Sequence, residues 1–402
     1  MRRRVVITGC GVVTAAGTEL EPFWRNIMAG TCFIGPVRHF SCPGMDPLTG
    51  TEVELPEADA STENARGGRC GQLTLAAARR ALDHAGLRAG SPASEGGGVV
   101  VGTTLGEERQ VGELDDRWPA SGADSIDPGF FSRSDNHRLA TLVAARHGLG
   151  GPTVVSATAC SSGNAAIAWA YELVSSGGAD LMLAIGADAL TRSIYTGFLR
   201  MGALSKSICH PFDRRLDGVT FGEGAGALVL EEAEHARRRG ATLHAELAGY
   251  GLSNDAHHIT APDPNGEGTV AAIRQALATS GTALGEVDYV SAHGTGTPYN
   301  DVAETKAMKA VFAERAAKVP MSSIKSMLGH TNGAASAIEA VACTLALRHQ
   351  AVPPTANLTE PHPDCDLDYV PLRGRPMPVG TCLNLSAGFG GFNVCTVLKR
   401  AP

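Results

Sequence analysis

The feature that most constrains the fold of this chain is an internal repeat. Residues 75–87 read LAAARRALDHAGL, and residues 270–282, which lie 195 positions further on, read VAAIRQALATSGT. Each copy has the amphipathic pattern of a helix that stops at a glycine. Each is followed by an apolar segment that runs into a Gly/Thr turn, at residues 98–106 and 287–297. Alanine-rich helices can resemble one another by chance, but the matching order of helix, strand and turn favours two similar α/β halves.

A second pair of segments supports this duplication. The sequence CSSGNAAIA starts at Cys160 and HTNGAASAIEA starts at His330, each with a glycine in fourth place and small residues after it. Each segment is expected to begin a helix. The first follows the apolar residues 153–157, and the second follows residues 319–327. We therefore expect Cys160 and His330 at corresponding places in the two halves.

Length and composition fit this organisation. The chain has 402 residues, of which 43% are hydrophobic, 19% are charged and 49 are glycines, as in a globular α/β protein with many tight turns. The Arg-rich residues 231–240 read as a connector. We expect a first half over residues 1–240, packed face to face with a second half over residues 241–402.

Charge and hydropathy exclude several classes of protein. The formal net charge of -7 argues against a broad surface for nucleic acid. No apolar run reaches membrane-spanning length. The opening MRRRVVITGCGVV resembles the front of a signal peptide, but Gly9 and Gly11 interrupt it, so a first β-strand is the better interpretation. We expect a cytoplasmic protein.

The ten cysteines are scattered and none forms a Cys-x-x-Cys pair. We expect most of them to be reduced and buried, and we expect no metal site. The neighbouring His257 and His258 are interpreted as part of a loop, because adjacent residues rarely converge on one metal.

Cys160 is the candidate nucleophile. It lies between an expected strand and an expected helix, where backbone N–H groups and the helix dipole favour an anion and should lower the thiol pKa. A thiolate is the nucleophile that covalent acyl transfer requires. Taken alone, Cys160 could equally be a buried structural thiol.

Two histidines follow expected strands at glycine-rich turns, His293 in HGTGTPYND and His330 in KSMLGHTNG. The helix after His330 should keep its imidazole neutral and able to donate a hydrogen bond. Two neutral histidines can hold a thioester carbonyl oxygen and stabilise an enolate. A structural role is the alternative for either one.

Four charged residues accompany the histidines. We favour an ion pair between Lys325 and Glu339 that fixes the loop of the second histidine. Asp301 and Glu304 follow the first histidine on the next expected helix, where they either orient the site or simply complement the helix N-terminus.

A glycine-rich segment, GFGGFN, precedes an expected last strand over residues 394–398. Gly390 and Gly391 permit close backbone approach. A backbone N–H here could complete an oxyanion hole and Phe389 could close an acyl pocket, although an ordinary hairpin turn explains the segment equally well.

The motifs resemble those of the elongating, two-histidine β-ketoacyl-acyl carrier protein synthases. The resemblance covers nearly the whole chain and rests on RRRVVITGCGVVTAAG, TACSSG, PFDRRLDGVTFGEGAGALVLE, HGTGTPYND, KSMLGH, GAASAIE and GFGGFN. It implies the thiolase fold, in which duplicated βαβαβαββ halves form five layers, α-β-α-β-α. It also implies decarboxylative condensation of a malonyl thioester with an acyl chain held on a cysteine.

Residue by residue, the resemblance makes Cys160 the acylated nucleophile and makes His293 and His330 the pair that binds the malonyl thioester. It implies that Lys325 and Glu339 form the supporting ion pair.

The resemblance also assigns the oxyanion hole to the N–H groups of Cys160 and Phe389, with Phe389 as the gate. It implies no intrinsic cofactor or metal, because substrates arrive on the phosphopantetheine arm of an acyl carrier protein. Arg214 and Arg215 are candidates for a basic patch that meets this carrier. The family is dimeric, so we expect a homodimer or a heterodimer with a chain-length-factor-like subunit.

The chain departs from the usual family pattern at several places: Ser336 at the end of GAAG, Leu385, Ser386, Ala387 and Phe392 around GFGGF, His210 before PFD, and Leu216 before Asp217-Gly218. The GFGGF form is more similar to ketosynthases of type II polyketide systems than to housekeeping fatty acid synthases. A fatty acid elongation synthase, a thiolase, an initiating synthase and a non-catalytic chain-length partner are the alternatives.

Overall fold

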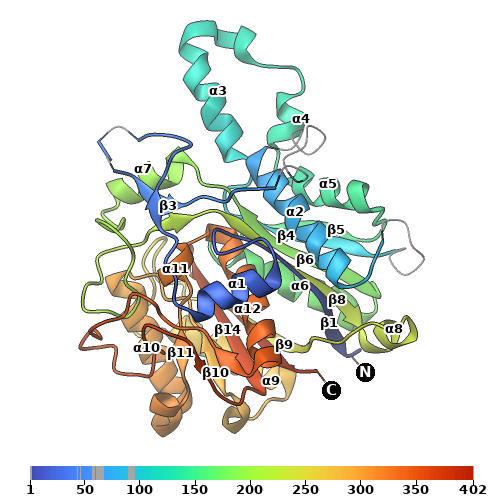
Figure 1. Ribbon diagram of the computed structural model, residues 1–402, viewed down its shortest axis with the longest axis vertical. Coiled ribbons are helices and arrows are strands. Elements are labelled where there is room, and N and C mark those ends of the chain that lie inside the picture. Colours follow the sequence, from blue (N-terminus) through green and yellow to red (C-terminus); the bar gives the residue numbers. More distant parts are fainter. Residues whose placement is uncertain are drawn as a thin grey trace.

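The computed structural model describes residues 2–42, 44–45, 47–56, 59, 68–88 and 96–401 (Figure 1). Its main elements come in two sets of eight. The first set is β1 (Val5–Val13), α2 (Arg69–His84), β4 (Gly98–Gly102), α5 (His137–His147), β5 (Thr153–Ser156), α6 (Ser162–Ser176), β6 (Leu181–Asp188) and β8 (Gly224–Glu232). The second set is β9 (Ala245–Asn254), α9 (Glu267–Ser280), β10 (Tyr289–Ser291), α10 (Pro298–Phe312), β11 (Met321–Ser322), α12 (Ala335–His349), β14 (Thr381–Gly388) and β15 (Phe392–Arg400). Both sets read βαβαβαββ.

The strand order repeats in the same way. One ten-stranded sheet has the order β11-β10-β14-β15-β9-β1-β8-β6-β4-β5. Within each set of five, the strands lie in the order third, second, fourth, fifth, first, and the first and fourth strands run antiparallel to the fifth. The predicted duplication is therefore confirmed. We propose that the halves divide near residue 240, between α8 (Ala233–Arg238) and β9.

Three hydrophobic clusters define the layers. One cluster packs α2 and α5 against the first half-sheet, and another packs α9 and α10 against the second. The largest cluster lies between them and is built from α6, α12 and the inner faces of both half-sheets. The order is α-β-α-β-α, so the expected five layers are confirmed and α6 and α12 form the middle layer.

The repeated alanines have a packing role. A Cβ atom at Gly11 of β1 would lie 2.2 Å from the carbonyl oxygen of Ala77, and one at Gly251 of β9 would lie 2.0 Å from that of Ala272. Ala77 and Ala272 occupy the same place in the two repeat copies. Small residues on strand and helix therefore let each outer helix approach its first strand closely.

One expectation about local structure was wrong, and a second segment gains detail. Residues 319–327 contain only the two-residue strand β11, followed by the short helix α11 (Lys325–Leu328). Residues 231–240 do connect the two halves, and they contain the end of β8 and the helix α8. Both segments are short, and the hydrophobic pattern does not show where a strand ends and a helical turn begins.

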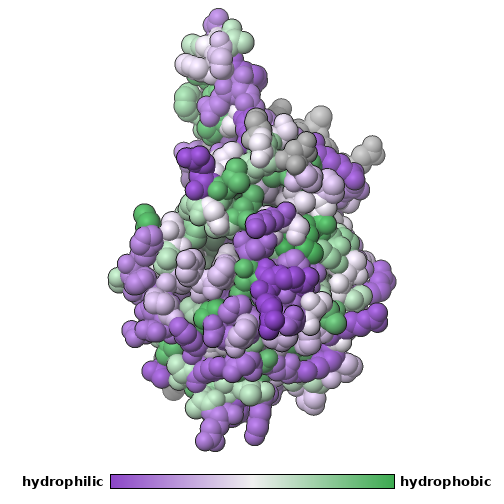
Figure 2. Space-filling view, turned by 90° about the vertical axis from the view of Figure 1, so that its left-hand side faces the viewer, coloured by the Kyte–Doolittle hydropathy of each residue, from purple (hydrophilic) through white to green (hydrophobic). Residues whose placement is uncertain are grey.

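An arm that the sequence did not predict projects from one end of the body (Figure 1). It consists of α3 (Glu108–Ser121) and α4 (Phe130–Ser134), and Trp118 and Phe131 on it are 49% and 71% exposed. Figure 2 shows hydrophobic residues gathered near the base of the arm on the face it displays. Within the described residues, no helix is both long and apolar enough to cross a bilayer.

Further short elements in the described residues are α1 (Leu20–Met28), α7 (Arg192–Arg200), β2 (Gly35–Pro36), β3 (Thr49–Thr51), β7 (Phe221–Gly222), β12 (Ala351–Val352) and β13 (Arg375–Pro376).

Candidate active site

Four of the predicted site residues line one cavity. Cys160, His293, His330 and Phe389 face it from the heads of α6 and α10, the loop before α12 and the β14–β15 turn. Its volume is about 80 Å³, enough for a thioester group and a few waters. The fold thus brings Cys160 together with three residues that lie more than a hundred positions after it in the sequence.

Cys160 lies in a tight turn before α6. Ala159 has φ +49°, and the helix begins two residues after the cysteine, at Ser162. The N–H groups of Cys160 and Phe389 both favour the ionised sulfur and so act to lower its pKa. The expectation of a lowered pKa was wrong: burial raises the pKa of the Cys160 thiol to about 12, although Lys325 and the two N–H groups act in the opposite direction. Burial therefore outweighs the helix terminus.

The two histidines lie edge to face. Their ring centroids are 5.4 Å apart and the rings meet at 83°. Both nitrogens of His330 and Nδ1 of His293 are buried without a hydrogen-bond partner among the described residues. Burial and the positive charge of Lys325 hold both pKa values well below the usual range. Both rings are neutral, as expected, but burial rather than the helix after His330 is the main cause.

Two buried carboxylates hold the loop of His293. Glu304 accepts hydrogen bonds from the N–H groups of His293 at 2.7 Å and Gly294 at 2.9 Å. Asp301 accepts from the N–H of Thr295 at 3.1 Å. Burial raises the pKa of Glu304 to about 7 and that of Asp301 to about 6. Both side chains therefore contact the backbone that aims the imidazole.

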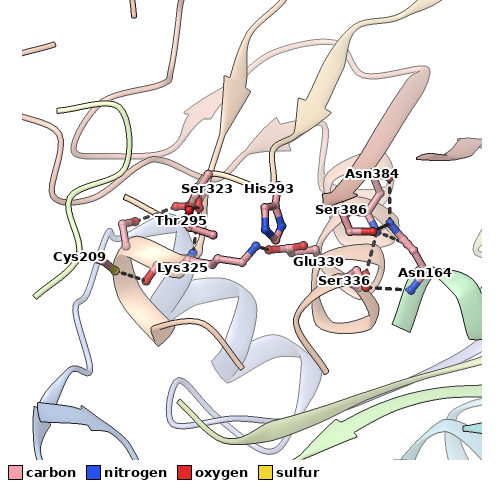
Figure 3. Close-up of polar contacts among 12 residues, drawn as sticks. Asn164, Cys209, His293, Thr295, Ser323, Lys325, Ser336, Glu339, Asn384 and Ser386 are labelled. Carbon is pink, nitrogen blue, oxygen red and sulfur yellow. Dashed lines mark hydrogen bonds and ion pairs between the residues drawn. The ribbon is translucent and has the colours of Figure 1, made fainter. Parts of the chain in front are cut away.

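Lys325 and Glu339 form a buried ion pair beside His293 (Figure 3). Lys325 Nζ donates to Glu339 Oε1 at 2.5 Å, and the two side chains are 2% and 1% exposed. Lys325 begins α11 and Glu339 lies on α12, so the pair brackets the His330 loop. Burial raises the pKa of Glu339, against the opposing effect of Lys325.

The GFGG segment is the hairpin turn between β14 and β15. Gly390 and Gly391 have φ +86° and +80°, a backbone region that favours glycine. The turn places Phe389 against Phe198 with the rings stacked 5.2 Å apart. The segment is therefore a hairpin turn, and this turn also places Phe389 at the cavity; its roles in an oxyanion hole and as a gate stay predictions.

Sequence reasoning missed several residues at the site. Phe198 and Thr297 line the cavity. Asp188, at the end of β6, accepts hydrogen bonds from the N–H groups of Thr104 at 2.8 Å and Gly333 at 2.7 Å, and so ties the first half to the His330 loop. A carboxylate at a strand end was the only available signal for Asp188, and nothing in the local sequence singles out Phe198.

The remaining candidates do not line the cavity. Arg215 donates to Asp213 at 2.7 Å, and Arg214 pairs with Glu360 at 3.0 Å. His257 and His258 are exposed in a loop, as expected. No group of three or more metal-ligating side chains occurs within the part of the chain that the structure describes.

Comparison with known proteins identifies the class that this fold and site define. The family profile described as "Beta-ketoacyl synthase, N-terminal domain" matches residues 2–236, and that of the C-terminal domain matches residues 244–359. The chain is 38% identical to 3-oxoacyl-[acyl-carrier-protein] synthase 2 of Synechocystis sp., over 99% of this chain and 98% of that protein. It is 36% identical to the tetracenomycin polyketide synthase ketoacyl synthase alpha subunit of Streptomyces glaucescens, over 99% and 97%. The chain belongs to the β-ketoacyl synthase family.

Solved structures agree with this assignment. The ishigamide ketosynthase/chain length factor superposes with a TM-score of 0.93 at 39% identity, over the full length of both chains. A type II polyketide acyl-carrier protein in complex with its ketosynthase superposes with a TM-score of 0.92 at 34% identity, again over both full lengths. The expected thiolase fold is therefore confirmed.

Proposed function

We propose that this chain is a ketosynthase that extends an acyl chain held on Cys160 by decarboxylative condensation with a malonyl thioester. The observation that carries the proposal is the convergence of a buried cysteine, two neutral unpartnered histidines and two N–H groups on one cavity. The relatives include synthases of both fatty acid and polyketide type.

In the first step, the Cys160 sulfur attacks the carbonyl carbon of the incoming acyl thioester. The N–H groups of Cys160 and Phe389 hold the oxyanion. The bond to the carrier sulfur breaks, and the carrier thiol leaves with the proton that Cys160 gave up. With a thiol pKa of about 12, this proton must leave as the new bond forms.

In the second step, His293 and His330 donate hydrogen bonds to the malonyl carbonyl oxygen. The bond to the carboxylate carbon breaks, CO₂ leaves and the electron pair forms an enolate. The enolate carbon then attacks the acyl carbonyl on Cys160, the C–S bond breaks, and the sulfur takes up a proton. The histidines must be neutral donors for this step, as their burial ensures.

The proposed substrates arrive on the phosphopantetheine arm of an acyl carrier protein, and the chain pairs with a homologous subunit. A ketosynthase bound to its carrier protein and a ketosynthase with its chain length factor support this proposal. Both candidate carrier contacts are paired, Arg215 with the buried Asp213 and Arg214 with the exposed Glu360. Because an ion pair between two exposed side chains is weak, Arg214 is the more available of the two. We favour a type II polyketide pathway. Fatty acid elongation is the alternative, and a co-purifying homologue that lacks the cysteine would support the former.

Intact-mass measurement after mixing with an acyl carrier substrate tests the nucleophile. We expect an acyl adduct on the wild type and none on Cys160→Ala; an adduct that persists in this variant would show that the assignment is wrong. His293→Ala and His330→Ala should keep the adduct but lose malonyl decarboxylation by about a hundredfold or more. Normal condensation by either variant would remove that histidine from the mechanism.

A further inference from the structure

A buried polar network lies beside the Lys325–Glu339 pair, between the two central helices (Figure 3). It joins Asn164 on α6, Ser336 on α12 and Asn384 on β14, all of which are 0% exposed. None of these side chains takes part in the chemistry described above.

Ser336 connects the two halves directly. Its Oγ accepts a hydrogen bond from the N–H of Asn164 at 2.8 Å. Asn164 is the third residue of α6, where a helix has no acceptor of its own for the N–H group. Ser336 therefore caps the helix that follows Cys160, and it does so from the half that carries both histidines.

The two asparagines extend the network to the third segment of the site. Asn384 Nδ2 donates to Asn164 Oδ1 at 2.9 Å and to the carbonyl oxygen of Ser336 at 2.8 Å. Asn164 Nδ2 donates to the carbonyl oxygen of Asn384 at 3.1 Å and to Ser386 Oγ at 3.0 Å. The donors of both amides are thus used, and β14 is linked to both helices.

Each of the three residues that the network joins lies a few positions in sequence from a group at the cavity. Cys160 precedes Asn164 by four positions, His330 precedes Ser336 by six, and Phe389 follows Asn384 by five. The contact between the helices is tight, because a Cβ atom at Gly163 would lie 2.8 Å from Ser336 Oγ. A change in this contact therefore displaces the head of α6 relative to the histidines.

One member of the network departs from the family pattern that the sequence resembles. Glycine is expected where this chain has Ser336. A glycine has no hydroxyl and could not accept the Asn164 N–H. The hydrogen bond that joins Ser336 to Asn164 is therefore not a requirement of the reaction as such.

We infer that Ser336 is a positioning residue: through the Asn164–Asn384–Ser386 network it fixes the distance between the acyl group on Cys160 and the enolate held by the histidines. The inference rests on the proposed function. The enolate has two fates, since it can attack the acyl carbonyl or take up a proton. A displacement of about 1 Å can slow a positioned reaction about a hundredfold, and protonation of the enolate then wins.

The test is the amount of β-ketoacyl product formed per CO₂ released from a malonyl carrier substrate, on enzyme that has been acylated. We expect a ratio near one for the wild type and below about one half for Ser336→Ala, with condensation slowed about tenfold or more. The rate of Cys160 acylation, followed by intact mass, should stay within about twofold because the cysteine and both N–H groups remain. A purely structural role would lower product and CO₂ together and leave the ratio unchanged, which would overturn the inference.

Thr344→Val is the matched control. Thr344 is also a buried hydroxyl on α12, but it donates to the carbonyl oxygen of Ala340 in its own helix, whereas Ser336 bonds to α6. Its ratio should equal that of the wild type; a fall as large as that of Ser336→Ala would show that any buried hydroxyl on α12 has this effect, and would overturn the inference.

Ser386→Ala is the second variant, and it decides the question if Ser336→Ala does not fold. It removes one acceptor of Asn164 and should lower the ratio less strongly. Wild-type ratios in the folded serine variants would overturn the inference while the proposed function stands. If the wild type itself forms no acyl adduct and releases no CO₂, the proposed function fails and the inference fails with it.

Discussion

Removing the ammonium group of Lys325 should destabilise the protein in a way that depends on pH. Lys325 Nζ and Glu339 Oε1 are 2.5 Å apart, and both side chains are almost fully buried. Lys325→Met keeps most of the side-chain volume but leaves the Glu339 carboxylate buried without its counter-charge. Such a carboxylate stays buried only if it takes up a proton, and buried glutamates can reach pKa values of about 8–9.

The ordinary pKa of glutamate, 4.5, sets the size of the effect. At about 1.4 kcal/mol per pH unit, protonation of Glu339 costs about 3 kcal/mol at pH 7 and about 1 kcal/mol or less at pH 5. The sign follows from the raised folded-state pKa: protonation favours the folded state, so the penalty is absent at low pH and grows as the pH rises. The value at pH 7 agrees with about 3–5 kcal/mol for breaking a buried pair from one side.

Urea unfolding of Lys325→Met, Glu339→Leu and the double variant at pH 5 and pH 7 measures these free energies. We expect Lys325→Met to be far less destabilised at pH 5 than at pH 7. The double variant should be close to the wild type, because no unpaired buried charge remains. An equal loss at both pH values, together with additive single variants, would refute the reasoning.

Two further predictions concern the cavity and its hairpin. Alkylation of Cys160 by iodoacetamide should accelerate about tenfold per pH unit from pH 7 to pH 9, because burial raises the thiol pKa to about 12; a plateau below pH 8 would contradict this. Gly391→Ala should lower the free energy of unfolding by about 1–2 kcal/mol, because Gly391 has φ +80° and a Cβ atom there would lie 3.1 Å from Asn254 Oδ1. Gly112→Ala on α3 is the control, because no atom lies within 4 Å of the added Cβ. This variant should raise the free energy of unfolding by about 0.5–1 kcal/mol, and equal losses in the two variants would contradict the role of φ.

Much of the fold was predictable because its signals are local. The alanine-rich repeat, the glycine stops and the Gly/Thr turns predicted two similar halves, and the strand order confirmed them. The alanines recur because small side chains let α2 and α9 approach β1 and β9, which is a constraint within each half. The shape of residues 319–327 was not predictable, because the short strand and helix there depend on their neighbours.

The candidate site divides in the same way. The sequence by itself indicated that Cys160 and His293 follow strands at tight turns, and that Lys325 and Glu339 accompany His330; it did not show that the helix α11, rather than a strand, leads into His330. The residues next to a turn or a helix start in the sequence determine where it forms, so these placements could be predicted without the tertiary structure.

Only the tertiary structure decided how these groups behave. It brought residues from both halves to one cavity, buried the Cys160 thiol so that its pKa rises rather than falls, and stacked Phe198 on Phe389. It also joined Asn164 and Ser336, which lie 172 positions apart. Burial and contacts between residues distant in sequence arise from packing between the layers. Local sequence patterns therefore do not predict them.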